Sequence, residues 1–426
     1  MNFFLVIILA ILLGSYLLGL IVDTLNVRHA RTDLPEEFEG YYDADKYRKS
    51  QEYLRENTRF GIISDTVITP ISIAFILFGG FNIVDKFARG FSLGSILTGL
   101  IFAGTLLFAS QILLIPFSIY STFVIEEKYG FNRTTPKTFI LDILKSWLLA
   151  AVIGGVIFSV VLWLFEKAGA PAWFYCWIAV TVFQIFLTFI APVTIMPLFN
   201  KFILLEDGAL KSAIEEYARS QDFKIKGVFT MDASKRSTKS NAFFAGFGRF
   251  RRVVLFDTLI EKHTVEELVS VLAHEIGHYK KRHILKSIGI SILTTALMFF
   301  TLSLFINSRE LFAAFKMQEV SIYGSLFFFG FLYHPIGMTL SIFGNMLSRR
   351  HEYQADAYAV KTYNRPQSMI TALKKLSVEN LSNLTPHPLK VFLSYSHPPV
   401  LERIHTIREL YLETLHNLPR ALKKYP

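Results

Sequence analysis

Seven long apolar stretches limit what this chain can fold into more than any other feature of its sequence. A helix of about 20 apolar residues spans the hydrocarbon core of a membrane. Because lipid offers no hydrogen-bond partners, the backbone must satisfy its own polar groups there, as a helix does. The sequence therefore predicts a mainly α-helical, polytopic membrane protein. The seven predicted spans are Phe3–Leu25, Ile62–Val84, Phe91–Val124, Trp147–Phe165, Ala172–Ile190, Ile284–Ile306 and Ile322–Met346.

The amino-acid composition supports this prediction and excludes two other classes of chain. Charged residues make up 18% of the sequence, below the roughly 25% of soluble globular proteins, and phenylalanine alone occurs 41 times. So much apolar side-chain surface excludes both a soluble globule and a disordered chain. Cys176 is the only cysteine, so an intrachain disulfide and a thiolate metal site are excluded as well.

The net charge of +10 is explained by the membrane rather than by nucleic acid. No basic block is interleaved with stacking aromatic residues, so we expect no nucleic-acid binding. The loops between spans one and two and between spans three and four carry eleven lysines and arginines, against five on the opposite side. Basic loops stay in the cytoplasm, which places the N-terminus outside. The polar segment 200–283 and the tail after Met346 then face the cytosol.

The polar segment 200–283 has the pattern of a small α+β region. We predict a helix over Gly208–Gln221, short strands over Val228–Met231 and Arg252–Phe256, and a helix over Val265–Arg282 that continues towards span six. The chain then has four parts. They are residues 1–199 with spans one to five and their cytosolic loops, 200–283 in the cytosol, 284–346 with spans six and seven, and a cytosolic C-terminal helical region at 347–426.

The predicted helix Val265–Arg282 contains His274, Glu275 and His278 in the pattern His-Glu-Ile-Gly-His. Histidines four residues apart project from one face of a helix, so both imidazoles can reach one metal ion. Imidazole nitrogen suits Zn²⁺, and the glutamate between them can take a proton from a water molecule that the metal activates. The alternative is a pair of solvated histidines on a surface helix. The mostly apolar residues Val269–Ala273 predict a buried helix, which favours the metal site, with one zinc ion per chain.

A catalytic zinc site needs a third protein ligand and an open fourth position. One known arrangement requires a glycine and a histidine seven and ten residues after the first histidine. This chain has Lys281 and Ile284 there, and His283 is one residue out of register. The other arrangement takes a glutamate from a later helix, and Glu352 fits it. Asp356, one turn further on the same face, suits the free N–H of a ligating histidine. Rival ligands are His351, His334, Glu310 and Glu319.

Asn241, Ala242 and Phe243 are candidates for binding the substrate. Metalloproteases usually hold a peptide as an added strand against an exposed sheet edge, and an Asn-Ala-aromatic segment fits such an edge. The amide of Asn241 could then bind the peptide backbone. The alternative is a turn asparagine beside two aromatic residues of the core.

Two groups near the C-terminus are candidates for acting on the reacting carbonyl. His397, within Ser396–Pro399, could donate a hydrogen bond to the oxyanion of the tetrahedral intermediate. Arg403 could orient the site. The alternative is that the serine and histidine cap a helix whose first turn holds proline, with Arg403 on its solvated face.

Together these segments resemble one family, the type 1 CAAX prenyl proteases, which are integral-membrane zinc metalloendopeptidases. The resemblance extends over most of the chain and is not confined to the zinc motif. A shorter relative, the heat-shock-induced membrane metalloproteases of bacteria, has fewer spans and lacks the segment Glu126–Asn132. The matching segments outside the zinc motif are Glu126–Asn132, Ser237–Phe243, Val254–Leu259, Ser348–Asp356, Asn380–Leu384 and Tyr395–Pro399.

The resemblance implies a barrel of seven transmembrane helices around a large chamber, with the zinc site at its cytosolic end. By this resemblance the zinc ligands are His274, His278 and Glu352, and the general base is Glu275. The implied reaction is removal of the C-terminal tripeptide from a prenylated CAAX protein, together with more general proteolysis. The family's groups near the scissile carbonyl and their supports correspond to Asn241, His397, Arg403 and Asp356.

Three other functions stay open on the sequence alone. A host that makes no prenylated proteins would use the same machinery for membrane-protein quality control. Seven spans with polar residues such as Asp142 and Gln184 nearby also fit a transporter, and a pseudoprotease would bind lipidated tails without cutting them. The membrane would be the endoplasmic reticulum in a eukaryote and the inner (plasma) membrane in a prokaryote.

Overall fold

The computed structural model describes residues 2–245 and 252–416. Within them, seven helices are long and apolar enough to cross a membrane, which confirms the predicted number of spans. In chain order they are α1 (Phe3–His29), α2 (Ala44–Leu77), α4 (Ser95–Tyr120) with a π-helical extension (Ser121–Glu126), α5 (Pro136–Leu149) joined to α6 (Gly155–Lys167) by a π-helical turn, α7 (Ala172–Thr194), α12 (His283–Ser303) and α14 (Ile322–Tyr363).

Two transmembrane helices differ from their predicted extents. The sequence predicts a continuous span over Ile62–Val84, but Gly79 adopts a left-handed backbone conformation (φ +73°) that glycine accepts without strain. The helix therefore breaks into α2 and α3 (Gly80–Arg89). Span seven is predicted to end at Met346, but α14 continues without interruption for 42 residues. The candidate ligand Glu352 thus lies on the helix of span seven itself, which comes later in the chain than the helix of the two histidines, as the sequence predicts.

The helix that carries the two histidines also ends earlier than predicted. α11 (Val265–Lys280) is followed by Arg282 in a left-handed backbone conformation (φ +57°), and α12 begins with His283. A left-handed residue cannot continue a right-handed helix. The prediction that one helix runs over Val265–Arg282 and on towards span six is therefore wrong, because the chain bends between the two helices.

The contacts between the seven spans follow chain order and close on themselves. Each span contacts the next one along the chain, and α14 closes the ring against α1. In the most apolar part of each span, only between 0 and 17% of the residues are buried. A solid helix bundle would bury its inward faces, so the ring encloses open space, as expected of a barrel around a chamber.

The end of the barrel near the N-terminus is closed by a phenylalanine-rich core. Phe102, Phe315 and Phe328 are fully buried there, and the last two stack with ring centroids 3.9 Å apart. A buried hydrogen bond also joins α3 to α14, since the carboxylate of Asp85 accepts from the hydroxyl of Tyr323 (2.5 Å). This packing leaves the opposite end of the barrel for the polar part of the chain.

The polar end carries a small sheet with strand order β1-β2-β4-β3. β2 and β4 pair in parallel, and β1 and β3 pair antiparallel on either side of them. The predicted strands over Val228–Met231 and Arg252–Phe256 are confirmed as β2 and β4, and β3 lies at an edge of the sheet. β1 is not predicted by the sequence pattern. The strands are β1 (Phe202–Leu204), β2 (Gly227–Met231), β3 (Ala242–Ala245) and β4 (Arg252–Phe256).

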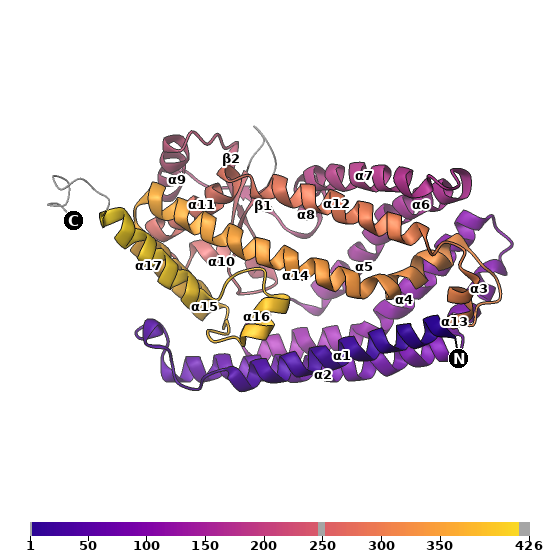
Figure 1. Ribbon diagram of the computed structural model, residues 1–426. Helices are drawn as coiled ribbons and strands as arrows, with labels where there is room; N and C mark the ends of the chain where they lie inside the picture. Colours follow the sequence, from indigo (N-terminus) through magenta and orange to yellow (C-terminus); the bar gives the residue numbers. More distant parts are fainter. Residues whose placement is uncertain (1, 246–251, 417–426) are drawn as a thin grey trace.

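Helices gather around this sheet and the end of α14, on the left in Figure 1. Their apolar faces and the sheet share one core, to which Leu255, Leu272 and Ile407 contribute fully buried side chains. The predicted helix Gly208–Gln221 is confirmed as α9. The remaining helices are α8 (Met196–Phe199), α9 (Ala209–Ser220), α10 (Asp257–Ile260), α13 (Arg309–Ala314), α15 (Pro366–Glu379), α16 (Pro388–Ser394) and α17 (Val400–His416).

Candidate metal centre

The helix with the two histidines is fixed at its start and along one face. Thr264 caps α11 through a reciprocal pair of hydrogen bonds with Glu267. Further along, α11 packs closely on α14, since a Cβ atom on Gly277 would lie 3.0 Å from the backbone of Ala355. This close approach brings the two ligand-bearing helices together.

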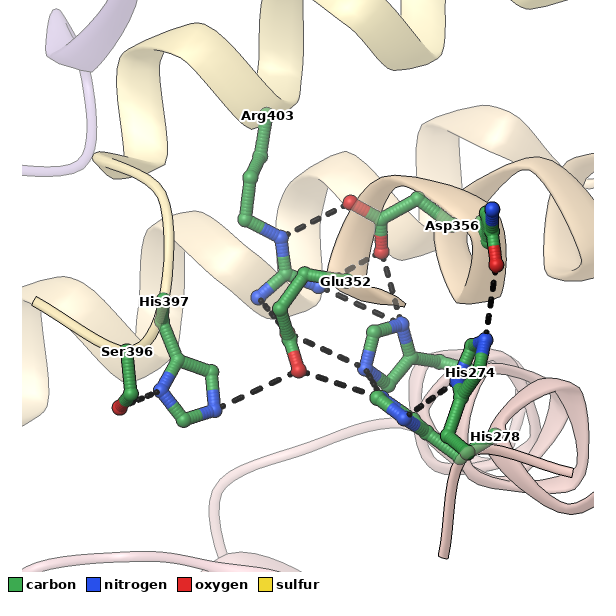
Figure 2. Close-up of polar contacts among 9 residues, drawn as sticks. His274, His278, Glu352, Asp356, Ser396, His397 and Arg403 are labelled. Carbon is green, nitrogen blue, oxygen red and sulfur yellow. Dashed lines mark hydrogen bonds and ion pairs between the residues drawn. The ribbon is translucent and has the colours of Figure 1, made fainter. Parts of the chain in front are cut away.

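His274, His278 and Glu352 converge as the sequence predicts (Figure 2). The Nε2 atoms of the two histidines lie 3.1 Å apart, and they lie 3.2 Å (His278) and 3.5 Å (His274) from the carboxylate oxygens of Glu352. Tetrahedral zinc with bonds of about 2.0–2.1 Å separates its ligand atoms by about 3.3 Å. The three atoms therefore have the spacing of three corners of such a site. Within residues 2–245 and 252–416, no other group of histidine, cysteine or acidic side chains has this geometry.

The chemistry of these three side chains also fits a cation. Glu352 is buried, and its Oε2 atom accepts no hydrogen bond from the described residues, although Arg403 (3.3 Å) and His274 (3.5 Å) lie within ion-pair distance of it. Two imidazole nitrogens that face each other at 3.1 Å have room for at most one proton between them, so at least one of them carries a lone pair that points into the site. A divalent metal would bind both nitrogens and compensate the buried carboxylate. The residues therefore fit a metal ion that takes nitrogen and oxygen ligands, such as zinc.

The close packing at Gly277 leads to a testable prediction. Gly277→Ala would place a methyl group 3.0 Å from the Cα and carbonyl oxygen of Ala355, so α11 must move away from α14. We expect a loss of stability of about 1–3 kcal/mol and weaker metal binding, because the histidines then move away from Glu352. Thermal unfolding and zinc titration measure the two effects. The control is Gly289→Ala in α12, where the added Cβ meets nothing within 4 Å. Equal behaviour of the two variants would contradict the tight contact.

On the side of its ring away from Glu352, His274 contacts the buried ion pair of Asp356 and Arg403. Its Nδ1 lies 2.7 Å from Asp356 Oδ1, to which it donates, so that Nε2 is left for the metal. Arg403, from α17, donates two hydrogen bonds to the same carboxylate (2.6 and 2.9 Å) and lies 3.3 Å from Glu352 Oε2. Only 11% of the Arg403 side chain is exposed. The alternative of a solvated arginine is therefore wrong.

The electrostatic surroundings shift the pKa values of two neighbouring side chains on α11. Burial by itself would lower the pKa of His274, but the contacts with Asp356 and Glu352 raise it to about 9. A metal ion that enters the site must therefore displace a proton. Burial, together with the charge of Glu352, raises the pKa of Glu275 against the opposing effect of the two histidines. A carboxylate with a raised pKa holds an accepted proton more readily, which suits a general base.

His397 approaches Glu352 from the side opposite the two imidazoles (Figure 2). Its Nε2 lies 3.5 Å from Glu352 Oε1, and 65% of its side chain is exposed. Its Nδ1 shares a hydrogen bond with the hydroxyl of Ser396 (3.0 Å). A donor to a substrate carbonyl is expected in such a place, next to a ligand and open to an incoming molecule.

Sequence reasoning missed Arg349, which anchors the segment that carries His397. Arg349, on α14, donates hydrogen bonds to the carbonyl oxygens of Val391 (3.0 Å) and Tyr395 (2.5 Å). These carbonyls lie at the end of α16, immediately before the Ser-His-Pro-Pro segment. The sequence held a signal for this residue, since Arg349 belongs to the family-like segment Ser348–Asp356.

None of the four rival ligands joins the three-atom site. His351 stacks on His283, with ring centroids 3.9 Å apart. His334 contacts a serine of α1 (3.5 Å). Glu310 lies on α13, at the opposite end of the barrel (Figure 1), and Glu319 follows that helix in the chain.

Asn241, Ala242 and Phe243 lie at the edge of the sheet, on and just before β3. The N–H of Ala242 donates to Asn241 Oδ1 (2.8 Å), so the NH₂ group of Asn241 is the part that can bind a peptide. Phe243 packs on Phe256 with perpendicular rings 6.2 Å apart, as a core aromatic does. β3 contacts α11, so this edge runs beside the helix of the two histidines. Among the described residues, Asn241 forms no hydrogen bond with His274, His278 or Glu352.

The loop just before Asn241 is fixed by two of the family-like segments. On one side, Lys239 forms an ion pair with Glu126 (2.8 Å), which belongs to the segment Glu126–Asn132. On the other side, the N–H of Ser240 donates to the side-chain oxygen of Asn380 (3.2 Å), from the segment Asn380–Leu384. These two segments, whose role the sequence did not reveal, therefore hold the start of the edge strand in place.

Two family models match successive parts of the chain. Residues 23–201 match the family described as CAAX prenyl protease N-terminal, five membrane helices, and residues 204–411 match peptidase family M48. The CAAX prenyl protease 1 of Saccharomyces cerevisiae is 35% identical to this chain over 401 residues, which cover 88% of each protein. The chain belongs to the CAAX prenyl protease 1 family.

Other proteins of the CAAX prenyl protease 1 family are similar over the same extent. The human CAAX prenyl protease 1 homolog is 32% identical over 425 residues, or 89% of each chain. The crystal structure of S. mikatae Ste24p matches this structure with a TM-score of 0.90 at 34% identity, covering 95% of this chain and 99% of that one. The family identifies this protein as a membrane metalloendopeptidase with the fold described above.

Proposed function

We propose that this chain is a zinc endopeptidase that removes the C-terminal tripeptide from prenylated CAAX proteins. The observation that carries the proposal is the convergence of His274, His278 and Glu352 in a member of the CAAX prenyl protease 1 family. Two imidazoles and one carboxylate form a common catalytic zinc site that leaves a fourth position open. We therefore propose one Zn²⁺ per chain.

Each residue around this site has its own role in the proposed hydrolysis. A bound zinc would supply a Lewis acid for the attacking water and the peptide carbonyl. Glu275 takes the proton from that water and passes it to the leaving amine. His397 donates a hydrogen bond to the carbonyl oxygen as negative charge develops on it. Asp356 and Arg403 hold His274 in the orientation that the metal requires.

The open edge of β3 is the proposed binding site for the peptide backbone. An extended peptide can add to this edge as a further strand, with main-chain hydrogen bonds supplying affinity. Because β3 contacts α11, we propose that a strand added there lies near the helix of the two histidines. Asn241 would bind the backbone of the peptide through its NH₂ group, and Ala242 and Phe243 would pair with it.

A cavity beside the metal centre suits the lipid part of a prenylated substrate. It has a volume of about 380 Å³, lies between α7, α12 and α14, and reaches His278. The side chains of Ile185, Ile284 and Ile288 line it, together with several hydroxyl groups. An apolar chain is favoured in such a pocket because its surface leaves water or lipid headgroups.

The orientation in the membrane and the division into parts also belong to this proposal. The distribution of lysine and arginine favours a cytosolic site, in the endoplasmic reticulum of a eukaryote or the inner (plasma) membrane of a prokaryote. The proposed parts are residues 1–199, 200–283, 284–346 and 347–426.

A transporter is less well supported, because the two polar residues that suggested one already have partners within the protein. Asp142 accepts two hydrogen bonds from Arg236, and Gln184 donates to Ser291.

Metal analysis combined with a cleavage assay tests the proposed function. We expect about one zinc per purified chain, release of the tripeptide from a farnesylated CAAX peptide, and loss of this activity on chelation with recovery when zinc is added back. The same peptide without its lipid is the control for prenyl specificity. Cleavage that survives complete removal of the metal would overturn the proposal. Equal cleavage of the peptide without its lipid would instead favour the quality-control alternative.

A further inference from the structure

His278 is held by a second set of contacts that differs from the ion pair behind His274. Its Nδ1 atom lies 3.0 Å from Nδ1 of His283, the first residue of α12. The other nitrogen of His283, Nε2, lies 2.9 Å from the side-chain oxygen of Gln354. His283 is 3% exposed, so water does not compete for these contacts. The three side chains form a hydrogen-bonded row that ends at the proposed metal ligand.

The bend between α11 and α12 makes this row possible. In a continuous helix each residue advances by about 100°, so a residue five positions after His278 would point about 140° away from it. The left-handed Arg282 breaks the helix and returns His283 towards the histidine pair. His283 is one residue away from the position that a third ligand would occupy, but the bend places it in contact with the ligand His278.

The positions of the protons in the row follow from Gln354. A side-chain amide oxygen can only accept, so the proton of a neutral His283 lies on Nε2 and its Nδ1 carries a lone pair. His278 must then donate from Nδ1, which leaves the lone pair of its Nε2 directed at His274 and Glu352. The reverse orientation of the amide would reverse each hydrogen bond and put a proton on the nitrogen that faces the metal site. Only the orientation with the amide oxygen towards His283 is compatible with metal binding.

We propose that His283 and Gln354 are positioning residues that fix the tautomer and the ring orientation of the metal ligand His278. The inference rests on the metal centre proposed above. It assigns the two ligands different supports, a carboxylate for His274 and a neutral imidazole with an amide for His278. His351 completes the support by stacking on His283, with an angle of 10° between the rings.

The zinc affinity of the purified full-length protein, measured by competition with a chromogenic chelator, tests this role without any peptide substrate. Replacing His283 by alanine should weaken zinc binding about 10–100-fold, as loss of a partner of a metal ligand generally does. His283→Asn should restore most of the affinity, because the asparagine oxygen can accept the same hydrogen bond. Gln354→Glu keeps an acceptor and should bind zinc normally, whereas Gln354→Met should lose affinity.

A matched control separates this role from a merely structural one. His263 is also buried and its Nδ1 contacts a backbone carbonyl, but it touches none of the ligands. His263→Asn should leave zinc affinity unchanged, and the metal-free form of His283→Asn, which keeps a hydrogen-bond acceptor and most of the side-chain volume, should unfold close to the temperature of the parent. Parent-like zinc affinity in His283→Ala would overturn the inference, and so would a loss that His283→Asn does not restore. If the parent itself binds no zinc, the proposed metal centre fails instead.

Discussion

Replacing Glu275 by glutamine should lower peptide cleavage by about 10²–10⁴-fold, the usual contribution of a positioned general base, while zinc stays bound. Glutamine has nearly the same shape but cannot take a proton from water. The side chain of Glu275 forms no hydrogen bond or ion pair within residues 2–245 and 252–416, so the change removes its charge but no such contact there. The ligands His274, His278 and Glu352 remain in place. Cleavage kinetics and metal content, measured on the same preparation, separate the two effects.

The control for this variant lies on the same helix. Glu266 is exposed in the first turn of α11, so Glu266→Gln makes the same chemical change away from the site. It should cleave at the rate of the parent. Full activity in Glu275→Gln would reject its role as the base, and loss of zinc from that variant would mean that Glu275 also supports the metal.

The chemistry of the site could be predicted because it depends on short spacings. His274 and His278 are four residues apart, and so are Glu352 and Asp356, so each pair shares one helical face whatever the rest of the fold does. The structure brings the two pairs together through α11 and α14, with Asp356 behind His274. Spacing therefore predicts each pair, whereas the meeting of the two pairs depends on the packing of α11 against α14.

The path of the backbone between helices could not be predicted in the same way. The apolar pattern runs from the segment 265–282 into span six without a break, and nothing in it signals the left-handed conformation of Arg282. If the helix is assumed to continue unbroken, the position of His283 shows only that this residue does not fit as a metal ligand. Its contact with His278 became visible only when the bend between the helices was known.

The end of the helix of span seven could not be predicted for a related reason. Hydropathy falls after Met346, and this change marks where a span leaves the lipid rather than where its helix ends. α14 continues with a polar surface, and the same rigid helix therefore carries both the seventh span and Glu352. The strand β1 has only three residues, too few to show an alternating pattern.

The position of Glu352 on this long helix leads to the prediction with the largest expected effect on metal binding. Glu352→Gln should weaken zinc binding by on the order of 100-fold or more, because the metal loses its only anionic ligand in a buried site. Peptide cleavage should fall in parallel. The fold should persist, because Arg403 keeps both hydrogen bonds to Asp356. Chelator competition gives the affinity, and thermal unfolding of the metal-free protein reports on the fold.

The comparison of two variants makes this prediction specific. Glu275→Gln should keep zinc and lose cleavage, whereas Glu352→Gln should lose both, because one residue moves protons and the other holds the metal. Glu402→Gln is the control, since this exposed glutamate of α17 is next to Arg403 in the chain and its carboxylate accepts one hydrogen bond within the described residues, from the hydroxyl of Tyr353 (3.1 Å). Normal zinc affinity in Glu352→Gln would show that the third ligand is another residue, and the metalloendopeptidase would then need a different metal centre.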